Sequence, residues 1–100
     1  MLEQIKSEMS RNRIIVTVIG QDRVGIIARV ATILADHQIN ILDISQTILQ
    51  EFFAMVLIAD MEKSSLELDS LKEKLNQLGK EMGVKIEAQH EDVFRYMHRI

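Results

Sequence analysis

The sequence predicts an α+β domain of ferredoxin-like architecture, in which two interleaved βαβ halves build one four-stranded antiparallel sheet. Two observations predict it. Strand-period and helix-period apolar patterns alternate along the chain in the order βαββαβ, and a short closing helix follows. The 100 residues, 47% of them hydrophobic, are enough for one domain with its own core. In this class both helices pack on one face of the sheet and the strand order is 4-1-3-2, so the second strand is expected at an edge.

The first half of the chain predicts a strand, a helix and a strand after an N-terminal extension at residues 1–12. The domain itself is expected to span 13–100. A β-branched run marks the first strand at 13–19, and apolar residues at helical spacing mark a helix from Asp22 to about His37. The second strand is expected from Asn40 to Gln50. Its apolar and polar residues alternate, which indicates one buried face (Leu42, Ile44, Ile48) and one polar face turned away from the helices (Asp43, Ser45, Thr47).

The second half predicts a hairpin partner, a helix, a strand and the closing helix. Residues 52–61 form an apolar strand after a tight break at 50–51. Ser64 and Glu67 fit a capping box for the second helix, with Ser65 as a rival cap. The apolar stripe of that helix ends at Met82, and Gly83 is a natural residue to follow its last turn. A fourth strand from Val84 and a short helix over 91–99 complete the chain.

The junction between the first strand and the first helix is the candidate functional centre. Asp22 is placed to cap the helix with its side chain, and Gly25 is expected in the first helical turn. A glycine there costs about 1 kcal/mol relative to alanine. One reason to keep it is that something approaches the backbone closely, and a helix N-terminus with free N–H groups binds anions. The alternatives are purely structural roles, in which Asp22 only caps the helix and Gly25 only lets the helix pack closely on the sheet.

Composition and motifs exclude several classes of function. Without cysteine there is no disulfide, thiolate or zinc–sulfur chemistry, and three scattered histidines give no metal-site spacing, so neither a metal nor a cofactor is expected. The 12 basic residues are dispersed among 15 acidic ones, which argues against nucleic-acid binding. No apolar run is long enough to cross a membrane, and the charged start lacks a signal-peptide core, so a cytoplasmic protein is expected.

Two rivals share the predicted fold. An acylphosphatase binds an anion at the first strand–helix loop with an arginine four residues after a glycine, the spacing of Gly25 and Arg29. However, Arg29 falls beyond the first helical turn, and the Asn-Thr-x-x-Gly segment is missing. An RNA-recognition fold stacks bases on aromatic residues of its sheet. Its third-strand motif is only loosely matched at 51–56, and core packing of Phe52 and Phe53 is the favoured interpretation.

The same residues resemble the ACT domain. The resemblance rests on the Gly20-x-Asp-Arg-x-Gly-Ile26 junction, on Asn40-Ile41 opening the second strand, and on three longer stretches at 40–47, 52–56 and 93–97. The longer stretches are similar to small stand-alone ACT proteins, which are relatives of the ACT repeats in glycine-cleavage repressor-type regulators. The resemblance as a whole covers about residues 13–100. The resemblance implies a non-catalytic regulatory module that binds a small ligand, commonly an amino acid, at a homodimer interface.

Carried onto this sequence, the resemblance nominates eight ligand-binding residues: Asp22, Arg23, Val24, Gly25, Ile26, Asn40, Ile41 and Leu42. The N–H groups near Gly25 would hold a carboxylate, Asn40 would bind an amino group, and Arg23 could hold the carboxylate with two bonds. The dimer is expected to form through the edge strand and the first helix. ACT domains usually regulate an enzyme or repressor in the same chain, and no second domain is expected here, so the module would act in trans on a partner. A ligand-independent interaction module is the main alternative, and an acylphosphatase-like hydrolase is a more distant one.

Overall fold

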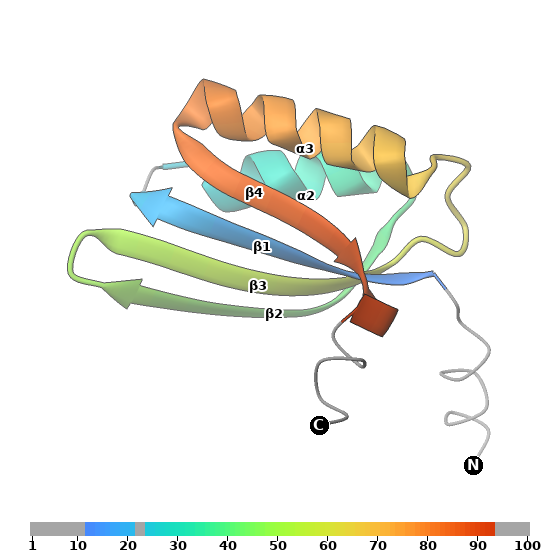
Figure 1. Cartoon of the computed structure of the whole chain (residues 1–100), viewed down its shortest axis with the longest axis horizontal. Coiled ribbons are helices and arrows are strands. Elements are labelled where there is room, and N and C mark those ends of the chain that lie inside the picture. Colours follow the sequence, from blue (N-terminus) through green and yellow to red (C-terminus); the bar gives the residue numbers. More distant parts are fainter. Residues whose placement is uncertain (1–11, 22–23, 94–100) are drawn as a thin grey trace, which may run out of the picture.

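The fold of the computed structural model, which describes residues 12–21 and 24–93, is the ferredoxin-like arrangement (Figure 1). The sheet has the order β2-β3-β1-β4, with every neighbouring pair antiparallel, as predicted. Its second strand is therefore an edge strand. In chain order the elements are β1 (Arg13–Gln21), α2 (Ile26–Asp36), β2 (Asn40–Leu49), β3 (Phe52–Asp60), α3 (Leu68–Met82) and β4 (Val84–His90).

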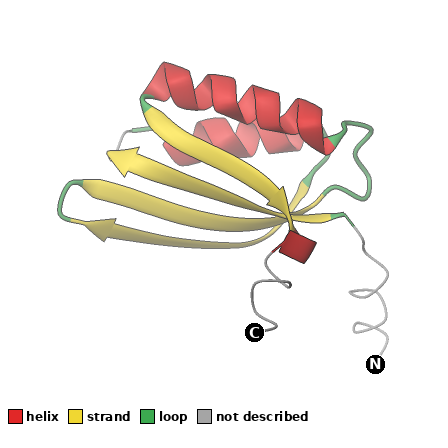
Figure 2. Ribbon diagram, in the orientation of Figure 1, coloured by secondary structure: helices red, strands yellow, loops and turns green. Residues whose placement is uncertain are grey.

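Both helices cover one face of the sheet, and the core lies between the two layers (Figure 2). Alternate residues of β1 and β3 point into it, and each helix adds a stripe at a spacing of three or four residues. Burial of these side chains supplies the main favourable term in folding. The core residues of these four elements are Ile14, Val16, Val18, Ile26, Val30, Leu34, Phe53, Met55, Leu57, Ala59, Leu71, Leu75 and Leu78.

The edge strand β2 differs from the prediction of one buried face. A bulge at Leu42 shifts its register against β3, after which Ile44 lies opposite Leu57 and Ile48 opposite Phe53. These partners face the helices, so Ile44 and Ile48 do too, and Asp43, Ser45 and Thr47 face away as predicted. Yet Ile44 is 39% exposed and Ile48 57% exposed. Figure 1 shows the reason: β2 lies at the far side of the sheet from α3, beyond the cover of the helix layer.

Both predicted helix starts were too early. Helix α2 begins at Ile26, with Gly25 as its N-cap in the left-handed region (φ 90°), so Gly25 precedes the first turn. Helix α3 begins at Leu68 with Glu67 as N-cap and no side-chain cap. The predicted capping box does not form, because the Ser64 hydroxyl accepts instead from the Leu66 N–H at 3.1 Å. The end of α3 is as predicted, with Gly83 left-handed at φ 73°.

Val84, the first residue of β4, packs between two glycines. A Cβ at Gly79 of α3 would lie 2.6 Å from the Val84 carbonyl oxygen, and one at Gly20 of β1 would lie 2.7 Å from a Val84 methyl group. Neither position has room for a side chain without movement of the backbone or of Val84. Gly79 is therefore a buried residue inside α3 at a point of close approach between this helix and β4.

The face of the sheet away from the helices is largely apolar along its two central strands. Phe52 is 54% exposed there, so the prediction that it packs in the core with Phe53 was wrong for Phe52. A one-residue change in position separates the two because strand side chains alternate between faces. The predicted closing helix begins at Glu91, whose carboxylate accepts from Arg13 Nη2 at 2.6 Å. Its remainder, like the extension at 1–11, lies outside the described residues.

Candidate functional site

The junction between β1 and α2 presents a helix N-terminus whose N-cap residue is a glycine. The first bond of the helix runs from the Arg29 N–H to the Gly25 carbonyl oxygen at 2.9 Å, so the N–H groups of residues 26–28 have no partner within the helix. Gly25, which occupies the N-cap position, has no side chain that could cap them. Asp22 and Arg23 lie outside the described residues, so the expected contact of the Asp22 side chain with this helix stays a prediction. Because α2 starts four residues later than predicted, the cap position belongs to Gly25.

Gly25 is explained by its backbone conformation. A φ of 90° favours glycine strongly, whereas a Cβ built at this position would meet nothing within 4 Å. The alternative that Gly25 lets α2 pack closely on the sheet is therefore wrong. Val24 beside it is fully exposed, while Ile26 is buried in the core and anchors the first turn. A helix N-terminus with N–H groups that have no partner within the helix is the geometry that binds carboxylates and other anions.

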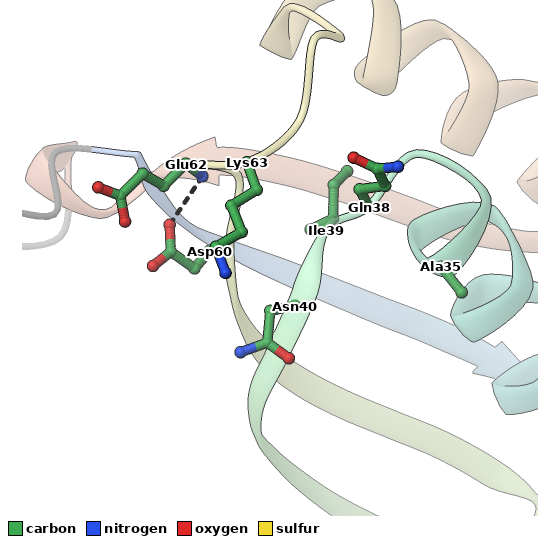
Figure 3. A pocket seen from close by; sticks show the side chains of 7 residues that line it. All are labelled: Ala35, Gln38, Ile39, Asn40, Asp60, Glu62 and Lys63. Carbon is green, nitrogen blue, oxygen red and sulfur yellow. Dashed lines mark hydrogen bonds between the residues drawn. The ribbon is translucent and has the colours of Figure 1, made fainter.

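The second predicted segment, at the start of β2, borders a cavity of about 440 Å³ (Figure 3). Asn40, the first residue of β2, is exposed at the edge of the cavity, two residues after the left-handed residue Gln38 (φ 60°). Ile41 is half-buried against the core, and Leu42 is the exposed bulge residue. A cavity of this size falls within the range of small-molecule sites. The residues that line it are Ala35, Gln38, Ile39, Asn40, Asp60, Glu62 and Lys63.

The two predicted segments lie at opposite ends of the domain. Asn40 pairs with Asp60, which in turn pairs with Arg13 at the start of β1. Gly25 instead follows the end of β1, where Gln21 pairs with Phe52. Figure 1 shows α2 running from the end near Gly25 to the end near Asn40. Within one chain, therefore, the structure does not bring the nominated residues together.

The cavity contains charged residues that the sequence analysis did not nominate. Asp60 lies directly opposite Asn40, and its Oδ1 accepts from the Glu62 N–H at 2.9 Å. Glu62 and Lys63 belong to the turn that follows β3. The carboxyl end of α2 closes the same cavity through Ala35 and Gln38, and no basic residue lies in its last turn. With two carboxylates, one ammonium and the negative end of a helix dipole, this cavity favours cationic groups.

Arg29 does not serve the junction. Its Nη2 donates to Glu81 Oε1 at 3.2 Å and so links α2 to α3 on the surface. The acylphosphatase interpretation needs this guanidinium at the loop, so the structure removes its main support. Among residues 12–21 and 24–93, no group of three or more His, Asp or Glu side chains could hold a metal ion. In the same part of the chain, no helix has the length and apolarity that a membrane crossing requires.

Comparison with known proteins decides the family. A family model of the ACT domain matches residues 12–89, most of the chain. The chain belongs to the ACT domain family. ACT domains are regulatory ligand-binding modules, and the resemblance of the strand–helix junction and the second strand to this family is confirmed.

Three similar proteins illustrate the relationship. A UPF0237 protein of Methanosarcina acetivorans is 49% identical over 92 residues, covering 92% of this chain and all of the relative. The solved ACT domain protein from Streptococcus pneumoniae superposes with a TM-score of 0.72 at 34% identity, covering 82% of this chain and 92% of that one. A protein described as a possible glycine cleavage system transcriptional repressor has a TM-score of 0.67 at 19% identity, covering 77% of this chain and 44% of that one. The last likeness shows the fold alone.

Proposed function

We propose that this ACT domain binds a small ligand, an amino acid foremost, between two subunits of a homodimer and thereby regulates a partner protein in trans. The proposal rests chiefly on the edge strand β2. Ile44 and Ile48 face the helix layer and yet stay exposed, and Asp43 is the only charged residue in the sequence of the strand. An edge of this kind pairs readily with another strand, and a second copy is the partner always available.

Antiparallel pairing of two β2 strands about a two-fold axis would join the separated halves of the nominated site. The axis would set the start of β2 in one subunit beside the end of β2 in the other. Asn40 would then approach the β1–α2 junction of the partner subunit, where Gly25 lies. Each dimer would contain two such sites, with Val24, Gly25 and Ile26 from one subunit and Asn40, Ile41 and Leu42 from the other. Asp22 and Arg23 complete the nominated set beside the same junction.

The chemistry of the ligand follows from the two parts of the site, the β1–α2 junction of one subunit and the start of β2 of the other. The N–H groups at the start of α2 would bind a carboxylate, and the Asn40 amide could accept from an amino group and donate to an oxygen. An amino acid carries both groups. The enclosed volume would grow when the partner's junction closes the cavity beside Asn40. Binding would stabilise the dimer, and a regulated protein could read that change.

The exposed edge also supports a second candidate, a dimerisation module that needs no ligand. A thermal-shift screen against the amino acids separates the two. A ligand at 100 times its Kd adds about 2.7 kcal/mol, which raises the Tm of a domain of this size by several degrees or more. A rise in Tm with one or two amino acids supports a sensor. If the protein is a folded dimer and no amino acid raises its Tm, only the interaction module is left.

Variants locate the site. Gly25→Asp places a carboxylate beside the free N–H groups, where it would repel the ligand's own carboxylate. Gly25→Asn is the matched control because it has the same size and tolerates a positive φ similarly, but carries no charge. Gly25→Asp and Asn40→Ala should both suppress the shift without dissociating the dimer, with Gly25→Asp far worse than Gly25→Asn. Normal binding by Gly25→Asp and Asn40→Ala would place the site elsewhere.

A further inference from the structure

The cavity beside Asn40 contains charged side chains to which the proposed function assigns no role. Its charged members are Asp60, Glu62 and Lys63, which leaves it with one net negative charge. Asp60 is half-buried, whereas Glu62 and Lys63 are exposed. In Figure 3 the side chains of Asn40 and Asp60 come from neighbouring strands at the same end of the sheet, with the Lys63 side chain reaching between them. The pairing of the two strands places Asp60 directly beside Asn40, the residue already nominated for the ligand.

Asp60 is held in place before any ligand arrives. It is the last residue of β3, and Asn40 is its direct neighbour on β2. The hydrogen bond from the Glu62 N–H to Asp60 Oδ1, at 2.9 Å, fixes the carboxylate at the start of the following turn. A group whose orientation is set by such a bond loses little freedom on binding, which is the condition for strong and selective recognition.

The dipole of α2 favours the same assignment. Its carboxyl end closes the cavity, where the Leu34 and Ala35 carbonyl oxygens accept from the turn residues His37, Gln38 and Ile39. A helix carries about half a negative charge at this end and about half a positive charge at the other, where Gly25 lies. In the proposed dimer the positive end of α2 in one subunit meets the negative end of α2 in the other. The site between them is then polarised along its length.

We infer that Asp60 binds the ammonium group of the ligand and makes the site selective for zwitterions. The inference rests on the proposed function and adds to it the residue that binds the ammonium group. The ligand's carboxylate lies against the N–H groups at the start of α2, and its ammonium displaces the exposed Lys63 side chain from the space between Asn40 and Asp60 of the partner subunit. A compound with the same carbon skeleton but a hydroxyl in place of the ammonium keeps the first contact and loses the charge-assisted one.

The experiment compares amino acids with their 2-hydroxy acids by calorimetry: alanine with lactate, leucine with 2-hydroxyisocaproate and phenylalanine with phenyllactate, extended to the pair of any amino acid that binds. The full chain should bind its amino acid at least tenfold more tightly than the hydroxy acid, because a hydrogen bond between two charged groups is stronger than one from a neutral hydroxyl. Equal affinities would overturn the inference and leave the proposed function standing. Binding by none of these compounds would overturn both.

Asp60→Asn tests the residue itself. The amide can still accept from the Glu62 N–H, so the turn keeps its hydrogen bond while the charge is lost. The preference for the amino acid should fall to less than threefold, with the affinity for the hydroxy acid unchanged. Glu62→Gln removes the same charge from the same cavity at an exposed position and should keep most of the preference. If Asp60→Asn retains the full preference, or if both variants lose it equally, Asp60 is not the ammonium-binding residue.

Discussion

Strands β1 and β2 have similar apolar content, but their inward-facing side chains are buried to very different extents. The inward residues of β1, Ile14, Val16 and Val18, are almost completely buried beneath the helices. Ile44 and Ile48 of β2 face the same layer but remain substantially exposed, because that layer does not reach the edge. Side-chain periodicity predicts which face of a strand is apolar. It does not predict what covers that face, and for β2 the missing cover is a second subunit in our proposal.

The largest expected effect comes from a pair of residues that are direct neighbours in the register. Leu57→Ala in β3 leaves a cavity in the closed core and should reduce the free energy of unfolding by about 2–5 kcal/mol. Ile44→Ala, opposite it on β2, removes a side chain that is already partly solvated and should cost about 1 kcal/mol. Urea titration at one fixed subunit concentration measures both. Equal losses would show that β2 is as well covered as the core.

The next effect contrasts a packed glycine with an open one. Gly79→Ala forces a methyl group against the Val84 carbonyl oxygen and should destabilise the fold by about 1–3 kcal/mol. Gly25→Ala meets no neighbour and should cost only the strain of its positive φ, about 1 kcal/mol. Thermal unfolding of the two variants gives the order. A Gly25→Ala variant less stable than Gly79→Ala would mean that Gly25 packs against something.

Two equally exposed isoleucines test which surface forms the dimer. Ile48 on β2 is 57% exposed and Ile19 on the open face of β1 is 58% exposed. Ile48→Glu should weaken the dimer by tenfold or more, because it buries a charge beside the paired edge. Ile19→Glu should leave the mass unchanged. Light scattering over a dilution series reports both, and dissociation by Ile19→Glu alone would move the interface to the open face of the sheet.

The smallest effect is expected at the surface link between the helices. Arg29 and Glu81 are both more than half exposed, and exposed ion pairs contribute about 0–1 kcal/mol. Arg29→Ala should therefore lower the Tm only slightly and leave amino-acid binding intact. Thermal unfolding without ligand measures the change in Tm, and the ligand screen measures the binding. Lost binding would mean that Arg29 reaches the ligand, as the acylphosphatase comparison required.

The fold was predictable because its signals are local and agree with one another. Continuous apolar runs and periods of two and 3.6 residues predicted every strand and helix from β1 to β4, and the known topology of the class put β2 at the edge. Helix starts were less predictable. Asp22 and Ser64 are both good capping residues in sequence, but the cap positions are Gly25 and Glu67. Local propensity for a cap does not establish where the packed face of a helix begins.

The candidate site was predicted only in part, and the bulge explains why Asp60 was missed. Counting back from the turn at 50–51 pairs Asn40 with Met61, a buried core residue. The bulge at Leu42 absorbs one residue and pairs Asn40 with Asp60 instead. No sequence signal marked that bulge. The separation of Gly25 from Asn40, by contrast, follows from the strand order and could have been deduced from it.

Mixed dimers test the central claim, that each site is built from both subunits. In the proposed dimer, a Gly25→Asp subunit paired with an Asn40→Ala subunit has one site with both substitutions and one with neither. After the two variants are mixed and re-equilibrated, half of the dimers are mixed. Calorimetry with the amino acid that gives the largest shift in the screen should then recover about one quarter of the wild-type sites at wild-type affinity. No recovery from a mixture that has exchanged subunits would contradict the shared site.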